Sequence, residues 1–539
     1  MKKWFILCAI VLAAFAIRAY KVSSLPPAMS WDEVSIGYNA YSILKTAKDE
    51  HGRLLPLDAF IAYGDYKPPL SIYATVPFVA AFGLNELSVR LPSVLAGTAM
   101  VFFVYLLAGQ LLGSYKRKEE VGLIAAGLLA FSPWHILLSR AGFEANIAAC
   151  LMVAGAWLLL STRTHPKRAL IAYLPFVAGV YTFNSARYFA PLLALGLTIY
   201  IYSAIRKNRK QFAIGVAVAA LSLFPILGHL VSPEARLRLA EVNIFSEHQV
   251  VIDANMRMQS DGDTWWSKIV HNRRVGYARS YVLHFLDHFQ PSFLFIRGDG
   301  NPKFSIQDVG QMYLIEAPFL VMGVLWAFGS MPKVAWFLVF WLIAAIAPAA
   351  IARETPHALR IENSLPVWQF FTAMGIAAFF AGRKGWIWKA VRLSVVMVFA
   401  AGVAYFSHNY FTHYSKEFSG EWQYGYRQAL EKAEALNGGY DTVVISDVIG
   451  RPYMYTLFHT LYDPEEFLNS RDSYFDAAGF YHVKGFGKYR FTHEEIGEAG
   501  PYEGKVLYIQ PPGMVPPSGT VVDTVTLLNG EPVLILFEQ

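Results

Sequence analysis

Long apolar stretches alternate with short polar connections over the first three quarters of the chain. The first stretch covers residues 4–17, and ten more follow at 91–112, 121–138, 147–160, 169–183, 189–205, 212–231, 312–328, 334–351, 365–381 and 390–406. A helix that crosses a bilayer needs roughly 20 predominantly apolar residues. The pattern therefore predicts a polytopic α-helical membrane protein with about eleven transmembrane helices.

Composition agrees with this prediction. Of the 539 residues, 55% are hydrophobic and 16% are charged, with a mean hydropathy of +0.34. These values argue against a soluble globular protein and against disorder. The first stretch can also be read as a cleaved signal peptide, with Ala14-Phe15-Ala16 as its cleavage site. Because that site lies inside the apolar stretch, we expect an uncleaved first span with a cytoplasmic N-terminus.

Lys and Arg are concentrated in every second connection. They occur at Lys2-Lys3, 116–118, 163–168, 206–210, Lys333 and 383–384. Cytoplasmic loops are rich in these residues, so we place all of these connections on the cytoplasmic side. This alternation requires that residues 70–84, which are short for a span and contain Pro77, do not cross the membrane. We therefore expect a juxtamembrane or re-entrant helix there, inside one large outer loop over residues 21–90.

The other connections are then extracytoplasmic, including a long loop over residues 232–311 and everything after about residue 408. From Glu421 onward the composition becomes that of a soluble protein. Helical patterns at 424–436 and 453–461 alternate with strand patterns at 442–446, 506–510 and 533–537. We predict a transmembrane domain over residues 1–408 and a small extracytoplasmic α/β domain over residues 421–539.

Two carboxylates follow the first span, in Met29-Ser30-Trp31-Asp32-Glu33. Ser30 and Glu33 have the spacing of a capping box, and residues 34–47 behind them look like an amphipathic helix lying on the membrane. A catalytic base is the other reading. The two are compatible, because a helix N-terminus favours the ionised carboxylate that a base requires.

Further ionisable side chains lie in the predicted outer loops. Lys67, in Tyr66-Lys67-Pro68-Pro69-Leu70, can bind a phosphate or any lipid headgroup. Glu144 and Asn146 lie at the mouth of a span, although Arg140 and Glu144 have the spacing to neutralise each other. Outer loops are normally poor in Arg, so a phosphate ligand would explain Arg187, His357 and Arg360. The alternative is a surface salt bridge to Glu354 or Glu362.

Other functional classes lack support in the sequence. The net charge of +6 is explained by the basic loops, and no basic run is interleaved with stacking aromatics as in nucleic-acid binding. His271, His284, Asp287 and His288 match no zinc motif. Cys8 and Cys150 both fall in apolar segments and suggest packing residues. Without a Gly-rich nucleotide loop, a sugar transferase facing away from the cytoplasm would need a donor carried by a lipid.

Three motifs together resemble those of the family 39 glycosyltransferases: Trp31-Asp32-Glu33, Tyr66-Lys67-Pro68-Pro69-Leu70, and the segment from Arg90 to Gly97. This family consists of GT-C membrane enzymes, among them protein O-mannosyltransferases and the bacterial transferases that put aminoarabinose on lipid A. The resemblance covers about the N-terminal two thirds of the chain. Its acidic motif corresponds to Asp32 and its basic residue before Pro-Pro to Lys67. Glu144 stands where many members have Asp, and Tyr66 where some have a zinc-binding Glu.

The resemblance implies inverting transfer of a sugar from a polyprenyl-phosphate donor to an extracytoplasmic lipid, glycan or protein. We assign Asp32, Glu33 and Glu144 as candidate catalytic residues and Tyr66 and Asn146 as candidate substrate contacts. Lys67, Arg187, His357 and Arg360 are the candidate donor-phosphate ligands. We expect a multi-pass plasma or inner membrane protein with no required cofactor and no nucleic-acid partner; a divalent metal has no supporting motif. The alternatives are a flippase for lipid-linked oligosaccharides and a glycan ligase or polymerase of the same fold.

Overall fold

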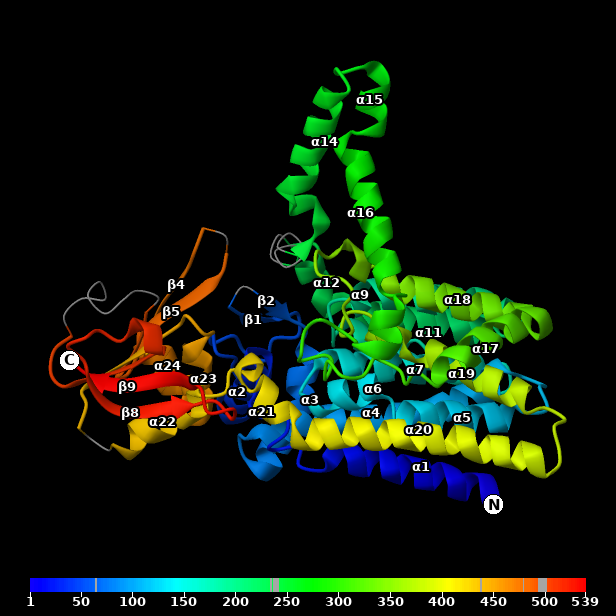
Figure 1. Ribbon diagram of the computed structural model, residues 1–539, viewed down its shortest axis with the longest axis horizontal. Helices are drawn as coiled ribbons and strands as arrows, with labels where there is room; N and C mark the ends of the chain where they lie inside the picture. The colour runs from blue at the N-terminus through cyan, green and yellow to red at the C-terminus, as the bar shows by residue number, and fades with distance from the viewer. Residues whose placement is uncertain (64, 233–234, 236–241, 437–438, 478, 493–501) are drawn as a thin grey trace. The chain divides into compact units, whose positions relative to one another are not determined.

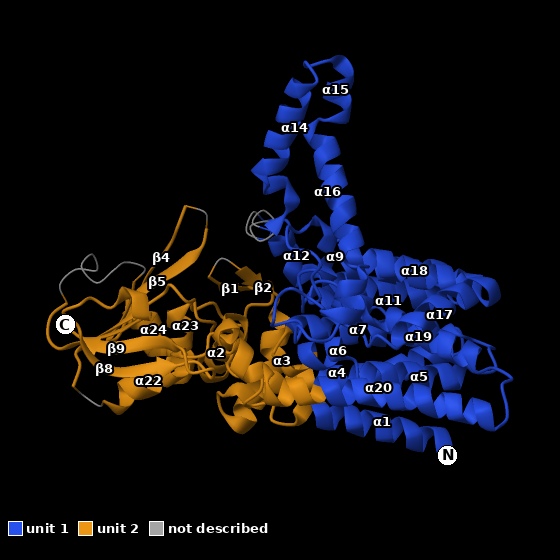
Figure 2. Ribbon diagram, in the orientation of Figure 1, with its two compact units in different colours: residues 1–17, 96–138, 144–406 blue, residues 18–95, 139–143, 407–539 orange. Residues whose placement is uncertain are grey.

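The computed structural model describes the chain except for residues 64, 233–234, 236–241, 437–438, 478 and 493–501. It divides into two compact units (Figure 2). Unit 1 comprises residues 1–17, 96–138 and 144–406, and unit 2 comprises residues 18–95, 139–143 and 407–539. Unit 1 is a bundle of helices, whereas unit 2 combines helices with a β-sheet (Figure 1).

Each apolar stretch predicted to span the membrane contains helix. The bundle is formed by α1 (Lys2–Ala19), α4 (Glu86–Leu111), α5 (Lys118–Ala130), α6 (Pro133–Arg140), α7 (Glu144–Ser161), η1 (Pro166–Leu170), α8 (Leu174–Val180), α9 (Ala186–Tyr200), α10 (Tyr202–Lys207), α11 (Arg209–Ser222), α12 (Phe224–Leu230), α17 (Glu316–Ser330), α18 (Pro332–Ile346), η4 (Ala349–Ile351), α19 (Leu365–Phe379) and α20 (Trp386–Thr412).

The described residues contain fewer full-length spans than the eleven we predicted. Four helical segments are long and apolar enough to cross a membrane, at 86–111, 144–161, 332–351 and 386–412. Two bent pairs, α5 with α6 and α11 with α12, would raise the number to six. Their bends of 56° and 54° lie next to Pro133 and Pro225, where the missing N–H groups interrupt the helical ladder. Proline thus divides stretches that look continuous in the hydropathy pattern.

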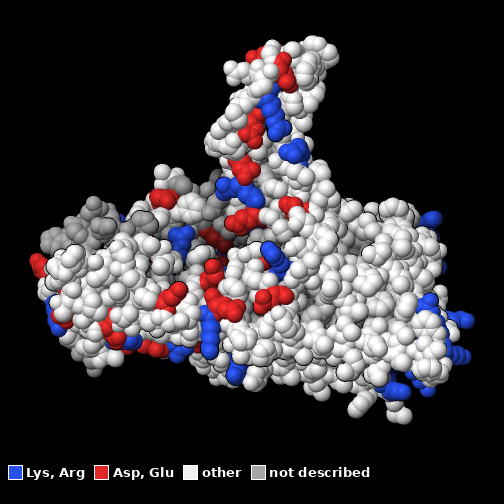
Figure 3. Space-filling model, in the orientation of Figure 1, with Lys and Arg blue, Asp and Glu red and all other residues white. Residues whose placement is uncertain are grey.

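Unit 1 has one basic end. Figure 3 shows Lys and Arg gathered at the end where the N-terminus lies, with nearly uncharged helix flanks beside them. Contacts join the predicted cytoplasmic connections at this end: Lys3 pairs with Glu119, Arg117 donates to the carbonyl of Ala377, Arg163 donates to the carbonyl of Gln110, and the ring of Tyr115 contacts that of Trp326. Several of the basic connections predicted to be cytoplasmic therefore lie together at one end of unit 1.

The pair α17 and α19 shows how closely the helices approach. A Cβ added to Gly323 would lie 1.7 Å from the carbonyl oxygen of Phe371, and one added to Gly375 would lie 1.9 Å from that of Phe319. The two backbones are thus in direct contact at these glycines. Close contact through small residues is a common means of packing helices in membranes.

A helical hairpin occupies the long predicted outer loop. It consists of α14 (His248–Ser260), α15 (Trp265–Val270) and α16 (Arg273–Asp287), and it projects from the bundle across the direction of the long helices (Figure 1). The short helices η2 (Ile244–Ser246) and η3 (Ser292–Ile296) flank it, and η5 (Glu362–Ser364) precedes α19.

Unit 2 begins with α2 (Trp31–Thr46), the antiparallel strands β1 (Phe60–Ala62) and β2 (Asp65–Lys67), and α3 (Pro69–Phe82). Its seven-stranded sheet has the order β4-β5-β6-β3-β7-β9-β8, with β3 parallel to β6 and β7 and the other pairs antiparallel. The strands are β3 (Thr442–Ser446), β4 (Asp472–Phe475), β5 (Tyr481–Phe486), β6 (Tyr489–Thr492), β7 (Val506–Gln510), β8 (Thr520–Thr526) and β9 (Pro532–Glu538). The C-terminal helices are α21 (Tyr414–Phe418), η6 (Gly420–Trp422), α22 (Tyr426–Ala435), α23 (Pro452–His459), α24 (Pro464–Ser470) and η7 (Pro512–Met514).

One hydrophobic core joins the first outer loop to the C-terminal elements. Val34 and Tyr38 of α2 are fully buried in the same cluster as Phe458 of α23 and Ile445 of β3. A Cβ on Gly37 would lie 2.6 Å from the ring of Phe458, so α2 and α23 pack closely. The expectation of a helix lying on the membrane was therefore wrong for α2, because apolar and small residues occur on several of its sides and bury it within unit 2.

Candidate active site

The N-terminus of α2 positions the acidic motif. Ser30 is the N-cap and forms the predicted capping box: its Oγ accepts the N–H of Glu33, and Glu33 Oε2 accepts the N–H of Ser30 at 2.9 Å. Asp32 lies in the first turn, with its side chain 34% exposed. The helix dipole stabilises a negative charge at this position. Asp32 is thus an accessible carboxylate with a fixed backbone.

Lys67 lies at the end of β2 and faces Asp32. Its Nζ donates to Asp32 Oδ1 at 2.5 Å and lies 3.5 Å from Asp65 Oδ2. The Lys67 side chain is only 2% exposed, and Pro68-Pro69 directly after it begins α3. The fold therefore brings together two predicted site residues that are 35 positions apart. It adds Asp65, which sequence reasoning missed, although residues two apart in a strand share one face.

Glu33 has a different environment from Asp32. Its side chain is fully buried, and Oε1 accepts both Arg90 Nε at 2.8 Å and the N–H of Gly142 at 3.0 Å. Arg90 in turn donates to the carbonyls of Val22, Pro26 and Ala28. Both oxygens of Glu33 are occupied, so this carboxylate holds the loop before α2 against α4. The motif that begins at Arg90, the third of those that resemble family 39, thus supplies the ion-pair partner of Glu33 in the first motif.

C-terminal residues complete the surroundings of the acidic motif within unit 2. The Tyr63 hydroxyl donates to the carbonyl of Trp31 at 2.6 Å, and the guanidinium of Arg451 lies 5.1 Å from the centre of the Tyr63 ring. Tyr455 donates to the carbonyl of Met29 at 2.9 Å. Burial, followed by the charges of Asp32 and Asp65, raises the pKa of Tyr63 well above its usual value. No local pattern marks Tyr63, Arg451 or Tyr455, because each reaches this loop only through the tertiary fold.

The remaining predicted residues divide between the units. Tyr66 is in β2 of unit 2, opposite Ile61 of β1, and is partly buried. Glu144 begins α7 in unit 1 and is partly buried, whereas Asn146 in the same helix is buried. Arg187, in the first turn of α9, is partly buried. Arg140 belongs to unit 2. Within that unit it donates to the carbonyls of Arg18 and Leu25 and to the hydroxyl of Tyr410.

His357 and Arg360 lie in a polar cluster of unit 1. The N–H of His357 donates to His288 Nε2 at 3.2 Å, and its Nδ1 is 3.9 Å from Asp299 Oδ2, which accepts the N–H of Ala358 at 2.6 Å. Arg360 Nη2 lies 3.5 Å from Glu354, one of its two predicted ion-pair partners. Because the Glu354 side chain is 80% exposed, this pair is weak.

Burial shifts the pKa of two groups of this cluster, in each case so as to favour the neutral form. It raises the pKa of Asp299 to about 6, against the lowering effect of the N–H groups of Asn301 and Ala358. It lowers the pKa of His288 to about 4, against the raising effect of the His284 carbonyl. Asp299 is a further polar residue that sequence reasoning missed, since it lies in a loop without a motif.

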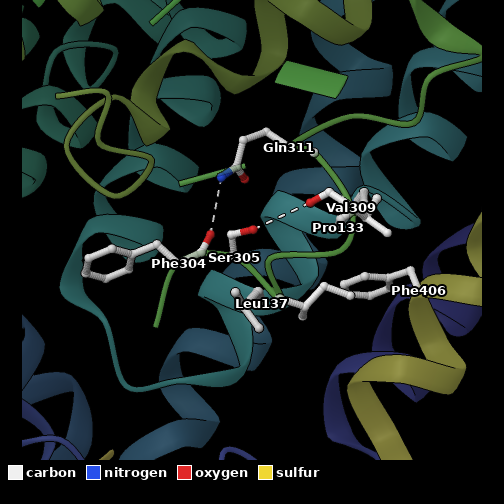
Figure 4. Close-up of a pocket in the computed structure, with 9 residues that line it drawn as sticks. Pro133, Leu137, Phe304, Ser305, Val309, Gln311 and Phe406 are labelled. Atoms are coloured by element: carbon white, nitrogen blue, oxygen red, sulfur yellow. Dashed lines mark hydrogen bonds between the residues drawn. The ribbon is translucent and has the colours of Figure 1, made fainter. Parts of the chain in front are cut away.

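Two cavities differ in what they can hold. Between α6 and the loop over residues 304–311, unit 1 encloses a cavity of about 10 Å³, which has room for one water molecule (Figure 4). Unit 2 contains a larger pocket of about 480 Å³ in its C-terminal part. Lys484, Arg451 and Arg490 line this pocket together with the rings of Tyr453 and Tyr481. Within the described part of the chain, none of the three cations forms a salt bridge.

No metal site was found among the residues that the structure describes: no three His, Cys, Asp or Glu side chains are grouped to hold an ion. Cys8 is exposed, Cys150 is buried, and both are free thiols.

Comparisons with known proteins agree on one fold. Residues 66–229 match the family model of dolichyl-phosphate-mannose-protein mannosyltransferase. ArnT from Cupriavidus metallidurans has 12% identity, with TM-scores of 0.55 in the apo state and 0.54 bound to undecaprenyl phosphate, over 98% of this chain and 97% of ArnT. The Archaeoglobus fulgidus oligosaccharyltransferase in the apo form has 13% identity and a TM-score of 0.53, over 85% of this chain.

The match to the oligosaccharyltransferase covers 63% of that protein's length. A search of curated protein sequences gave no significant match. At these identities the structural neighbours establish the fold, and the family model adds agreement over the segment that begins at Tyr66 and includes Lys67, Glu144 and Arg187. Residues 66–229 are thus similar to the dolichyl-phosphate-mannose-protein mannosyltransferase family, and the chain has the fold of ArnT and of the oligosaccharyltransferase, in agreement with the predicted resemblance to family 39 glycosyltransferases.

Proposed function

We propose that this protein is an integral membrane, inverting glycosyltransferase that moves a sugar from a polyprenyl-phosphate donor to an extracytoplasmic acceptor. The observation that carries the proposal is the contact between Asp32 and Lys67, which joins an accessible carboxylate to a buried cation. The family match begins at Tyr66, directly before this cation. ArnT, which shares the fold, has been crystallised with undecaprenyl phosphate.

Asp32 acts as the general base in this mechanism. It accepts the proton of the acceptor hydroxyl while that oxygen forms a bond to the anomeric carbon of the donor. The bond from this carbon to the phosphate oxygen breaks on the opposite face, and its electron pair leaves with the polyprenyl phosphate. The configuration at the anomeric carbon is therefore inverted. The leaving group is a stabilised phosphate anion, so the reaction does not require a strong general acid.

Lys67 serves both the base and the leaving group. Its ammonium has three N–H donors, and Asp32 and Asp65 lie within 3.5 Å of it. Asp32 and Asp65 thus share one cation, and the ammonium of Lys67 is the opposite charge that favours the ionised carboxylate a base requires. The donor phosphate can then take a place beside Nζ, where the cation offsets the negative charge that develops as the bond breaks.

Glu33 has a positioning role in this proposal, because Arg90 and backbone N–H groups occupy both of its oxygens. Glu144 remains a candidate second catalytic carboxylate. Arg187, His357 and Arg360 are proposed as further ligands of the donor phosphate. We propose substrate contacts for Tyr66 and Asn146.

We further propose eleven membrane passes in a plasma or inner membrane, with the basic end of unit 1 in the cytoplasm. The shorter and bent helices of unit 1 support this number, since each corresponds to a predicted stretch. In this arrangement the active site and residues 421–539 are extracytoplasmic. A reporter fused after Ala381 should then read cytoplasmic, and an extracytoplasmic signal there would refute the arrangement.

We propose the C-terminal pocket as the place where the acceptor binds. Three cations, the carboxylates of Asp447 and Asp472 and the tyrosine rings line it, a set that suits a polar ligand rich in hydroxyl groups. Arg451 lines this pocket and also packs on Tyr63, whose hydroxyl bonds to Trp31 next to Asp32. Deleting residues 421–539 would be a poor test, because those residues share a hydrophobic core with α2. Point substitutions in the pocket avoid this problem.

The experiment that tests the function offers a panel of radiolabelled polyprenyl-phosphate monosaccharides to the protein in proteoliposomes. We expect release of polyprenyl phosphate with one donor and a product of inverted anomeric configuration by NMR. A flippase would move the donor across the bilayer without releasing polyprenyl phosphate. A ligase or polymerase would turn over only glycan-loaded donors, so either outcome would contradict the proposal.

A further inference from the structure

The hairpin formed by α14, α15 and α16 belongs to none of the sites described above. Its helices pack against each other: a Cβ on Gly276 of α16 would lie 2.8 Å from Val250 of α14. The hairpin extends across the direction of the long helices (Figure 1). If those helices run along the membrane normal, the hairpin runs parallel to the membrane surface.

The base of the hairpin is attached at the end of unit 1 opposite to the basic end. The Tyr281 hydroxyl donates to the carbonyl of Ala347 at 3.2 Å, and His284 Nδ1 lies 2.9 Å from the carbonyl oxygen of Ala352. Both carbonyls follow α18, which begins beside Lys333 of the basic end. The hairpin is therefore attached where the long helices reach their other ends.

Large apolar side chains of the hairpin have no cover. Trp265 at the tip is 76% exposed and Ile269, one turn further, is 59% exposed. On α16, Val275, Val282 and Leu286 are 44–53% exposed. Residues 7 and 11 positions apart lie on the same side of a helix, so these three form one apolar face. A soluble surface rarely presents such a continuous set, and its presence marks an interaction site.

On α16 the charged residues Arg273, Arg274 and Asp287 lie away from this apolar face, whereas Arg279, four residues after Val275 and three before Val282, lies at its edge, where a long side chain can reach the headgroups. Figure 3 shows charged side chains in a band along the visible face of the hairpin, from its tip to its base, with uncharged surface beside the band. On α16, Arg273 lies nine residues before Val282, which is two and a half turns and so the opposite side of the helix. An amphipathic hairpin with tryptophan at its tip and arginine on its other side has the composition of an interfacial membrane element.

We infer that residues 248–287 lie in the headgroup layer of the outer leaflet, with the apolar face of α16 and the tip of α15 inserted among the lipids. The partner is the lipid surface, since the direction of the hairpin, its attachment, its exposed tryptophan and apolar side chains and its flanking arginines all fit a planar interface. This inference does not depend on the chemistry proposed above. The position of the hairpin does bear on donor binding. Because α16 leads directly into His288, which accepts a hydrogen bond from the N–H of His357, insertion would hold these two histidines near the level of the lipid phosphates.

Depth-dependent quenching tests this inference on the full chain. Cys8 and Cys150 are replaced by Ala, and single cysteines are introduced as Val282→Cys, Ile269→Cys and, as the matched control, Arg273→Cys. Arg273 and Val282 are both exposed and share one helix, so the two positions differ chiefly in the side they face. Each variant is labelled with an environment-sensitive fluorophore and reconstituted in nanodiscs of phosphatidylethanolamine and phosphatidylglycerol, with or without lipid carrying a shallow nitroxide on its acyl chain.

We expect the nitroxide lipid to quench labels at residues 282 and 269 several-fold more than the label at 273, and aqueous iodide to give the reverse order. Equal lipid quenching at 273 and 282, with equal access to iodide, would show a hairpin surrounded by water and overturn the inference. Protection of residue 282 from both quenchers would indicate a protein partner or a second copy, and would overturn it as well. Comparable melting temperatures of the three labelled variants serve as the control for folding.

Discussion

The buried pair of Glu33 and Arg90 gives the sharpest prediction about stability. The substitution Glu33→Gln keeps the size of the side chain but removes its charge. Arg90 would then be a fully buried cation without its carboxylate. The Gln amide group would also direct N–H donors at one of the N–H groups, of Ser30 or Gly142, that Glu33 now accepts.

The magnitude follows from these contacts. Removing one member of a buried ion pair costs about 3–5 kcal/mol. Arg90 keeps the carbonyls of Val22, Pro26 and Ala28, which offset part of the loss. For a unit of about 200 residues, each kcal/mol shifts the melting temperature by about 2–4 °C. We therefore expect Glu33→Gln to lower the melting temperature of unit 2 by about 10 °C.

The assay is a thermal scan of purified protein at one fixed scan rate, since large membrane proteins often unfold irreversibly. Asp58→Asn is the matched control in the same loop, because the pair of Asp58 with Arg53 is about one third exposed and should be worth about 0–1 kcal/mol. If Glu33→Gln melted at the wild-type temperature but no longer transferred sugar, the structural role of Glu33 would be refuted, and Glu33 would again be a candidate catalytic residue.

Three further predictions address the site. Lys67→Gln should lower kcat/KM for the donor by about 10²-fold, with partial recovery in Lys67→Arg, because one preorganised charge is lost; equal rates would exclude Lys67. Asp299, with a pKa raised to about 6, binds a proton in the folded state that the unfolded state releases near pH 4, so it makes stability fall as pH rises from about 4 to 6. His288, with its pKa lowered to about 4, has the opposite effect, so the melting temperature of Asp299→Asn should rise more steeply with pH over this range than that of the wild type; parallel profiles would contradict this. Lys484→Gln should raise KM for the acceptor, whereas Lys488→Gln, a lysine in the turn between β5 and β6 that pairs with Glu434, should not; equal effects would remove the pocket from acceptor binding.

Local patterns allowed much of the fold to be predicted. The strand at 442–446 and the strand at 506–510 have the predicted bounds, and the capping box at Ser30 is present. These features depend on neighbouring residues, which the sequence displays directly. The basic connections also meet at one end of unit 1, because loop charge follows the alternation of helices.

The parts that the sequence did not reveal depend on distant residues. Glu33 meets Gly142 across 109 positions, and Tyr63 meets Arg451 across nearly 400, so no local pattern marks either contact. The burial of α2 was missed because the helix packs on C-terminal elements that hydropathy treats as a separate segment. Asp65 was within reach of sequence reasoning, since it shares a strand face with Lys67, but the three-residue strand β2 is too short to be recognised from its pattern.

A single turnover of donor bound to the Asp32→Asn variant tests whether Asp32 is the catalytic base. The amide has almost the same size as the carboxylate but cannot accept the proton of the acceptor hydroxyl. We expect the variant to bind the polyprenyl-phosphate sugar but to transfer it at least about 10²-fold more slowly than the wild type. Transfer at the wild-type rate would contradict the assignment of Asp32 as the catalytic base.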